Sequence, residues 1–205
     1  MKSTVILASE STSKRALLAR LLRDFQVQAP EVDETPLADE TIREMVQRLA
    51  IKKAYAITTQ VADAIIIATD QVAALNGEVL GKPGTLSNAK AQLTKMSGQC
   101  VGFDTGLAIV DGRSGDLHCH HIHHDIIFKS LSPAVIDAYL AFDAPLACAG
   151  SFKLEAGGIG LIAHLSGPDF TAVSGLPLVL TAHILQQCGL SLYETIADNH
   201  NAATA

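Results

Sequence analysis

The sequence has 205 residues, of which 48% are hydrophobic and 4% aromatic, and its formal net charge at pH 7 is −6. This length suits one large domain with a buried core. The negative charge and the scarcity of aromatic rings argue against a broad basic footprint for a polynucleotide backbone and against an aromatic platform for stacked bases.

The cysteines and the apolar runs indicate the compartment. The four cysteines form no C-x-x-C pair, which is typical of reduced thiols in the cytoplasm. The apolar run at the N-terminus is too short for a signal peptide, and no apolar stretch reaches the roughly 18 residues of a membrane span. We therefore expect a cytoplasmic protein that does not cross a membrane.

Strands and helices alternate along the chain, which predicts an α/β fold. Alternation and apolar runs predict strands over 3–8, 64–75, 78–81, 101–110, 117–129 and 158–165. Helical periodicity predicts helices over 13–23, 41–58, 87–97, 132–142 and 176–188. We expect one domain over residues 1–193 and a frayed or disordered tail over 194–205.

Several boundaries carry recognisable capping and turn residues. Thr41 and Glu44 have the spacing of a capping box. Ser132 followed by Pro133 predicts a helix start. The pair Asn76–Gly77 predicts a two-residue hairpin turn, and Gly98 and Gly189 are expected to end helices.

The loop between the first strand and the first helix is rich in hydroxyl groups and then in cations. A helix N-terminus favours anions, because its first N–H groups lack partners within the helix. Lys14 and Arg15 oppose the helix dipole there, which suits an anion site but is also compatible with two solvated surface charges. No Walker motif is present, so the loop is not a P-loop. The hydroxyl groups belong to Ser9, Ser11, Thr12 and Ser13.

Lys53 falls on the apolar stripe of the helix predicted over 41–58, together with Val46, Leu49 and Ile57. Burying an unpaired ammonium is costly, so this lysine either extends to the surface or points into a cleft that holds an anion. We favour the cleft.

Asp70 interrupts the apolar run "AIIIATDQVAAL". A carboxylate in such a strand has to be paired, bound to a metal or exposed to a cleft. In the ideal register of the following hairpin Gln71 faces Lys82. Lys82 then reaches Asp70 only through a twist or a bulge, which Gly81 could supply. A structural ion pair is the simpler alternative.

Two further clusters have ambiguous chemistry. The group "PEVDET" contains Glu31, Asp33 and Glu34, and it is either a solvated loop or a source of hard oxygen ligands for Mg²⁺ or Mn²⁺. The stretch "HCHHIHH" over 118–124 has five histidines divided between the two faces of a strand. We favour a structural role for these histidines over a metal site.

Taken together, these motifs resemble the Maf family of nucleoside triphosphate pyrophosphatases, over nearly the whole chain. The resemblance rests on "ILASESTSKRALL", "APEVDETP", "RLAIKKA", "ATDQVAALNGEVLGKP", "LTKMSG", "TGLAIV", "PLACAGSFKLE" and "GLPL". The forms "DQV" and "CAGSFK" resemble the branch that hydrolyses 7-methyl-GTP more than the dTTP/UTP branch. The usual "SPxRR" of the family reads "STSKR" here.

The resemblance implies a mixed curved sheet in two lobes around a cleft, related to inosine-triphosphatase-like enzymes, and a homodimer. It implies a divalent cation (Mg²⁺, Mn²⁺ or Co²⁺), a nucleoside triphosphate substrate, and no polynucleotide or membrane partner. It places the acid-base residue at Asp70, metal ligands at Glu34 and Asp70, and base-selecting residues at Ser13, Gln71 and Glu155. The implied triphosphate ligands are Ser9, Lys14, Arg15, Lys53 and Lys82.

Three functions stay open from the sequence alone. The first is hydrolysis of 7-methyl-GTP or a related nucleotide, with the dTTP/UTP specificity as the variant within the family. The second is a non-catalytic nucleotide-binding regulator of cell division. The third is a metal-handling protein that uses the histidines over 118–124, which we regard as the weakest of the three.

Overall fold

A computed structural model describes residues 4–61 and 63–192. The strands are β1 (Thr4–Leu7), β2 (Gln26–Val27), β3 (Ala64–Leu75), β4 (Glu78–Leu80), β5 (Cys100–Asp111), β6 (Asp116–Phe128) and β7 (Ile162–Leu165). The helices are α1 (Thr12–Leu18), α2 (Ile42–Thr58), α3 (Leu86–Met96), α4 (Pro133–Asp143) and α5 (Leu178–Gln187). Three 3₁₀ turns complete the set, η1 (Ala149–Ser151), η2 (Gly157–Leu161) and η3 (Phe170–Ser174).

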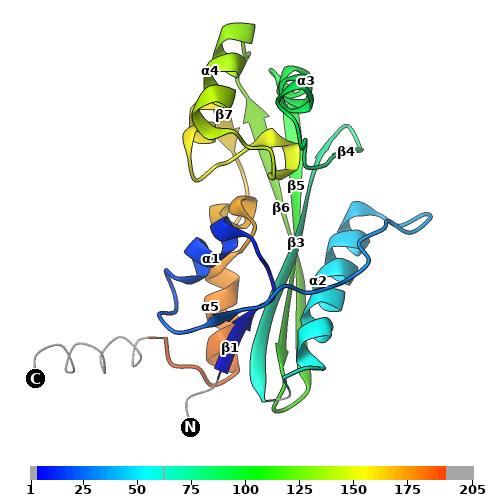
Figure 1. The fold of residues 1–205 in the computed structure, drawn as a ribbon, viewed down its shortest axis with the longest axis vertical. Coiled ribbons are helices and arrows are strands. Elements are labelled where there is room, and N and C mark those ends of the chain that lie inside the picture. Colours follow the sequence, from blue (N-terminus) through cyan, green and yellow to red (C-terminus); the bar gives the residue numbers. More distant parts are fainter. Residues whose placement is uncertain (1–3, 62, 193–205) are drawn as a thin grey trace, which may run out of the picture.

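The strands form one mixed sheet in the order β2-β1-β3-β5-β6-β7, with β4 paired to β3 beside this path. β1 is parallel to β2 and β3, and the remaining pairs are antiparallel. β3, β5 and β6 run along most of the molecule, with α2 on one side of them and α1 and α5 on the other (Figure 1). The predicted α/β fold with a mixed sheet is confirmed.

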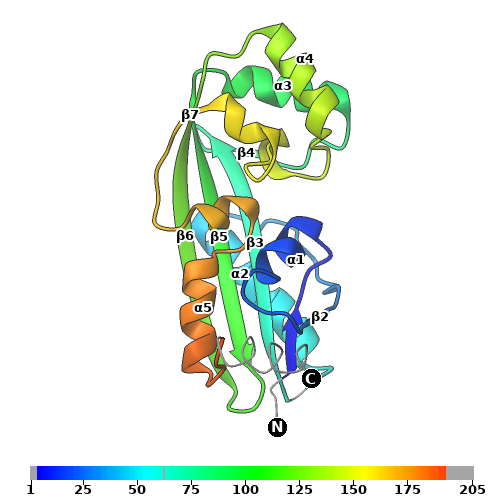
Figure 2. The same cartoon turned by 90° about the vertical axis from the view of Figure 1, so that its left-hand side faces the viewer.

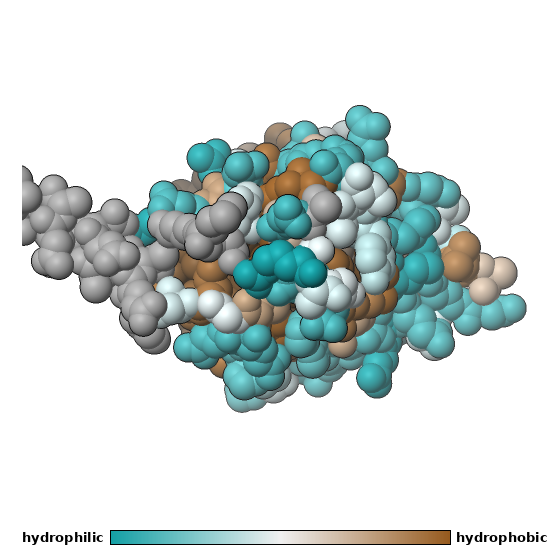
Figure 3. Space-filling model, turned by 90° about the horizontal axis from the view of Figure 1, so that it is seen from below, coloured by the Kyte–Doolittle hydropathy of each residue, from teal (hydrophilic) through white to brown (hydrophobic). Residues whose placement is uncertain are grey.

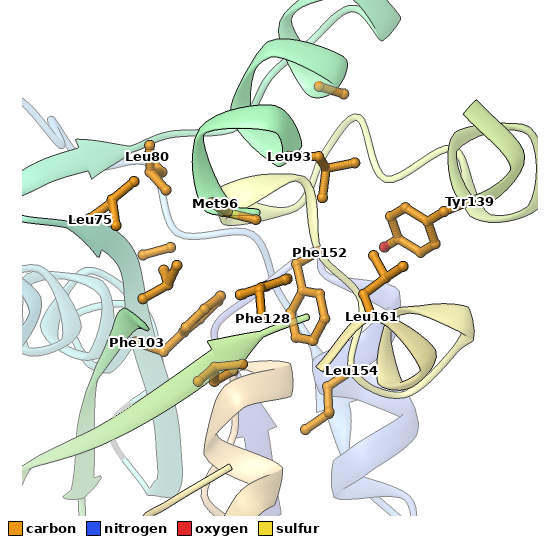
Figure 4. Packing of buried hydrophobic residues seen from close by; sticks show 14 of the residues in the cluster. Leu75, Leu80, Leu93, Met96, Phe103, Phe128, Tyr139, Phe152, Leu154 and Leu161 are labelled. Carbon is orange, nitrogen blue, oxygen red and sulfur yellow. The ribbon is translucent and has the colours of Figure 1, made fainter. Parts of the chain in front are cut away.

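Packed groups lie at both ends of the long strands (Figure 2). We call the part with β4, α3, α4, η1, η2 and β7 the upper lobe, and the part with β1, β2, α1, α2, η3 and α5 the lower lobe. β3, β5 and β6 belong to both. The upper lobe has one apolar cluster, in which the Phe152 ring contacts Phe103 and Phe128 at centroid distances of 5.8 and 5.2 Å (Figure 4).

The lower lobe has apolar clusters on both faces of the sheet. One lies under α1 and α5, and the others lie under α2. α2 approaches the sheet closely at Gly106 of β5, where an added Cβ would lie 2.1 Å from the backbone oxygen of Val46. Only glycine permits this distance, so Gly106 sets how near the helix comes to the sheet.

The predicted caps and the hairpin turn are confirmed. Thr41 and Glu44 form both hydrogen bonds of the capping box, and Ser132 caps the helix that Pro133 begins. Asn76 and Gly77 have φ values of 52° and 83°, which a type I′ turn requires. Gly98 and Gly189 follow the ends of α3 and α5 with positive φ.

Three predicted boundaries were wrong. The first helix ends at Leu18, because the hydrogen bonds that follow span three residues instead of four, as in the bond from Arg20 N–H to the carbonyl of Leu17. The strand predicted over 158–165 begins only at Ile162. The residues before it form η2, in which Gly158 packs so closely on Lys153 that a Cβ would lie 2.4 Å from its carbonyl oxygen. The last helix starts after Pro177, which is its N-cap.

The described helices include none that is long and apolar enough to cross a membrane. The lower end of the molecule shows polar side chains around apolar ones (Figure 3). The tail predicted over 194–205 lies outside the described residues.

His124 of β6 is 1% exposed, and neither of its ring nitrogens has a hydrogen-bond partner within the described residues. The ring lies against Gly167, where a Cβ would come within 2.1 Å of the ring carbon Cδ2. Burial lowers the pKa of His124 below its ordinary value, and the negative charge of Asp169 opposes this only in part. The folded protein therefore favours the neutral imidazole.

We expect His124 to make the protein less stable as the pH falls. Because its pKa is lower in the folded than in the unfolded state, its full contribution is present above about pH 6.5 and is lost as the pH falls below that value. His124→Leu removes this proton uptake, so the free energy of unfolding should vary less with pH in the variant. Urea titrations between about pH 5.5 and 7.5 measure this, and parallel pH dependences of the two proteins would contradict it.

Candidate active site

The polar interruption in β3 coincides with a gap in strand pairing. One edge of β3 pairs with β5 along nearly its whole length. The other edge pairs with β1 up to Ile67 and with β4 from Ala73. In the described part of the chain no strand pairs with this edge between these two residues. Thr69, Asp70 and Gln71 lie in the gap.

Successive side chains of a strand point to opposite faces, and these three do so. Asp70 points toward α2 and contacts Lys53. Thr69 and Gln71 point to the other face and donate hydrogen bonds to backbone carbonyls at 172–175. Residues 69–71 of β3 therefore have an ion pair on the face toward α2 and hydrogen bonds to segment 172–175 on the other face.

Lys53 is the ion-pair partner of Asp70. Its Nζ lies 2.6 Å from Asp70 Oδ1 and 2.7 Å from Glu34 Oε1. The Lys53 and Asp70 side chains are 11% and 10% exposed, whereas that of Glu34 is 56% exposed, so the cluster opens to solvent on the Glu34 side. Burial disfavours the charged form of Lys53, but the charges and hydrogen bonds of Asp70 and Glu34 outweigh it and raise the pKa. In the same way Lys53 overcomes burial and lowers the pKa of Glu34.

Lys14 reaches the same gap from the first turn of α1. Its Nζ donates to the carbonyl oxygen of Thr69 at 3.0 Å, at the edge of β3 that β1 has left. Burial and the positive charge of Lys53 lower the pKa of Lys14 to about 8, although Asp70 acts in the opposite direction. Among the residues that the structure describes, Lys14 forms no salt bridge with a carboxylate, so its ammonium is suited to an anionic ligand.

The other three predicted triphosphate ligands are Ser9, Arg15 and Lys82. Ser9 lies in the preceding loop and accepts a hydrogen bond from Ser11 N–H at 3.1 Å. Arg15 is exposed on α1. Lys82 is exposed after β4, and its positive charge affects the pKa of both Lys14 and Glu34.

The predicted hairpin register is confirmed from Leu75 and Glu78 to Ala73 and Leu80, but the pairing stops before it reaches Gln71 and Lys82. The ladder between β3 and β4 ends at Ala73 and Leu80, because the chain leaves the sheet at Gly81 before Pro83, which has no N–H to donate. From the sequence we considered Lys82 as a partner of Asp70, but in the structure Lys53 forms the ion pair with Asp70.

The base-selecting residues predicted from the resemblance lie in two places. Ser13 of α1 donates to Glu155 Oε1 at 2.6 Å, and this hydrogen bond joins the lower lobe to the upper lobe. The side-chain amide of Gln71 instead donates hydrogen bonds to the carbonyl oxygens of Ala172 and Val173. Sequence reasoning missed the contribution of segment 170–175, because contacts across about a hundred residues leave no local pattern.

The histidine-rich strand divides between two faces, as its alternation predicts. His121 and His123 both contact Asp104 Oδ1, at 2.6 and 2.9 Å, and His123 also contacts Asp125. His124 lies buried on the opposite face. Within residues 4–61 and 63–192, no three His, Cys, Asp or Glu side chains are arranged to hold a metal ion.

Removing the Lys53 ammonium should destabilise the protein. Lys53→Met leaves Asp70 as a buried carboxylate without its cation, so we expect the free energy of unfolding to fall by about 3–5 kcal/mol. Adding Asp70→Asn removes the uncompensated charge, and the double variant should regain part of this loss. Urea unfolding at pH 7 tests both expectations, and a single variant as stable as the wild type would contradict them.

Known proteins resemble this chain over nearly its full length. The family model described as Maf-like protein matches residues 4–188. A protein of Aromatoleum aromaticum named 7-methyl-GTP pyrophosphatase is 45% identical over 190 residues, which are 93% of this chain and 98% of that protein. A protein of Xanthomonas campestris pv. campestris with the same name is 45% identical over 192 residues, 94% of this chain and 100% of its own.

Solved structures resemble the chain only in part. A HAM1 protein from Coxiella burnetii and the Ham1 protein of Staphylococcus aureus each give a TM-score of 0.44, with 20% and 18% sequence identity. Each match covers 62% of this chain and 73% of the other. The sequence matches decide the family, and they confirm the prediction made from the motifs: the chain belongs to the Maf family.

Proposed function

We propose that this protein is a nucleoside triphosphate pyrophosphatase that converts 7-methyl-GTP and water to the nucleoside monophosphate and pyrophosphate. The name of relatives that are 45% identical over nearly their whole length supports this substrate. The observation that carries the proposal is the position of Asp70, a carboxylate within a cluster of lysines at the gap in β3.

The charges around the gap suit a polyphosphate. Lys14 and Lys53 approach Asp70 from α1 and α2. Burial disfavours their charged forms, but when they are protonated their charges act on a nearby anion more strongly than they would in water. Arg15 and Lys82 add exposed cations, and Ser9 adds a hydroxyl donor from the loop. We assign these five residues to the triphosphate, because phosphoryl transfer depends mainly on positioning and charge stabilisation.

Asp70 is assigned as the base that accepts a proton from the attacking water. The water oxygen bonds to the α-phosphorus while the bond from that phosphorus to the bridging oxygen breaks, and pyrophosphate leaves with the electron pair. Lys14 and Lys53 stabilise the charge that develops on the oxygens, since cations aimed at developing charge act strongly where water is partly excluded.

The carboxylates of this site fit a divalent cation. Glu34 and Asp70 lie on either side of the Lys53 ammonium, at 2.7 and 2.6 Å, and this ammonium fills the point between them. A divalent cation would therefore bind the second oxygen of each carboxylate. Hard oxygen ligands from one or two carboxylates, completed by substrate phosphates, are what Mg²⁺ and Mn²⁺ prefer. A bound Mg²⁺, Mn²⁺ or Co²⁺ would supply further neutralisation of the phosphate charge.

Base preference is assigned to the side of the site where Ser13 meets Glu155. The 7-methylated guanine ring is cationic, and Glu155 presents an exposed carboxylate on the upper lobe. Gln71, which the resemblance adds to this set, lies at the gap itself. The proposal also includes a single domain over 1–193 and a cytoplasmic homodimer that acts on free nucleotides, without polynucleotide or membrane partners.

Asp70→Asn should abolish turnover and leave nucleotide binding. The amide has the shape of the carboxylate but accepts no proton, so we expect pyrophosphate release to fall by about 10²–10⁴-fold. Coupled phosphate assays measure release, and calorimetric titration measures binding. Asp104→Asn is the matched control, since Asp104 is also a buried carboxylate, on the adjacent strand and bound to histidines. Equal losses in both variants, or turnover by Asp70→Asn, would contradict the assignment.

A panel of nucleotides should identify the substrate. We expect the highest kcat/KM for 7-methyl-GTP among 7-methyl-GTP, GTP, dTTP and UTP, assayed with Mg²⁺, Mn²⁺ and Co²⁺, and no release after chelation with EDTA. A preference for dTTP and UTP would place the chain in the other branch of the family. Saturable binding with no pyrophosphate under any condition would favour the regulator.

A further inference from the structure

Segment 170–175, formed by η3 and Gly175, is fastened to the sheet by side chains of two strands. Thr69 Oγ1 of β3 donates to the carbonyl of Gly175 at 2.7 Å, and Thr105 Oγ1 of β5 donates to that of Ala172 at 3.0 Å. Gln71 Nε2 donates to the carbonyl of Ala172 at 2.6 Å. Polar groups with both partners buried in this way fix a geometry strongly, because breaking one leaves the other unsatisfied.

Gly175 ends this segment directly against the side chain of Lys14. An added Cβ would lie 2.9 Å from Lys14 Cε and 3.3 Å from its Cγ. The glycine has a φ of +97°, as the left-handed C-cap of η3. A side chain at residue 175 would therefore press on the alkyl chain of Lys14, which would have to move away from its present position.

Thr69 connects the two halves of this arrangement. Its hydroxyl holds Gly175, and its carbonyl oxygen accepts the hydrogen bond from Lys14 Nζ at 3.0 Å. Lys14 is thus confined between the segment and β3, with its ammonium at the gap beside Asp70. Thr69 therefore contributes to both sides of this confinement, through its hydroxyl on segment 170–175 and its carbonyl oxygen on β3.

We propose that segment 170–175, clamped by Thr69, Gln71 and Thr105, is a positioning element that holds the Lys14 ammonium in the pyrophosphatase site, with Gly175 as the small residue against which the alkyl chain of Lys14 lies. This inference rests on the proposed function and deepens it. It also gives Gln71 a new role, since its amide fixes the segment instead of selecting the base.

The clamp has a chemical consequence that can be measured. Lys14 owes its pKa of about 8 first to burial and then to the charge of Lys53. A lysine displaced into solvent returns toward the ordinary value of 10.5. Correct placement of Lys14 is therefore visible as an amine that titrates near pH 8.

Gly175→Ala is the direct test, with Gly189→Ala as its matched control. Both glycines have positive φ, +97° and +78°, but an added Cβ at 189 has no atom within 4 Å. We expect Gly175→Ala to reduce kcat/KM at least about tenfold and to move the alkaline limb of its pH profile upward, whereas Gly189→Ala stays within about twofold. Equal effects of the two variants would overturn the proposal.

The Lys14 titration keeps the proposal separate from the function on which it rests. The ¹³Cε resonance of Lys14, assigned with Lys14→Arg in lysine-labelled protein, reports its protonation without any turnover. We expect a midpoint near pH 8 in the wild type and a clear increase in Gly175→Ala. If no nucleotide is hydrolysed, the proposed function fails, yet a shifted midpoint still supports the clamp. An unchanged midpoint overturns it.

Two further substitutions cover the case in which Gly175→Ala does not fold. Thr69→Val removes the hydroxyl and should shift the Lys14 midpoint, while Thr69→Ser should restore it relative to Thr69→Val. Gln71→Leu should lower kcat/KM by a similar factor for 7-methyl-GTP and GTP. A change in the ratio between the two nucleotides would instead assign Gln71 to base selection and overturn its role in the clamp.

Discussion

The ion pair between Asp70 and Lys53 constrains the rest of the site. A carboxylate in an apolar strand needs a cation at contact distance, and this cation comes from the inward side of α2. α2 has to lie very close to the sheet for the ammonium to reach Asp70, and Gly106 permits that approach. The third partner, Glu34, faces solvent, so the ion pair has its charges balanced while one side of the cluster stays accessible to solvent.

The short segment Thr69–Gln71 places an ion pair on one face of β3 and hydrogen bonds to a turn on the other face. Asp70 faces α2, where charges meet, while its neighbours face η3, where neutral hydrogen bonds hold a turn in place. Lys14 links the faces, because it binds the backbone of the strand at its edge. A gap between β1 and β4 is what leaves that edge available.

Much of this architecture follows from local patterns in the sequence. The long apolar strand through Asp70, the capping box at Thr41 and the turn at Asn76–Gly77 each depend on residues a few positions apart. The inward orientation of Lys53 followed from helical periodicity. These features were predicted because their causes lie within one helix or strand.

Features that depend on distant residues were not predicted in the same way. The partner of Asp70 was sought at Lys82 by extending a hairpin, but the choice between Lys82 and Lys53 depends on where the ladder stops. The hydrogen bond from Thr69 to the carbonyl of Gly175 joins residues 106 positions apart, and no local pattern near either residue indicates it.

Because β3 and β5 contribute residues to the apolar clusters of both lobes, unfolding of one lobe removes packing from strands on which the other lobe also rests. Phe103 and Ile109, for example, stand at opposite ends of β5 in separate clusters. The two lobes therefore share one cooperative unit, so that damage to the packing around Phe152 weakens the far end of the molecule as well.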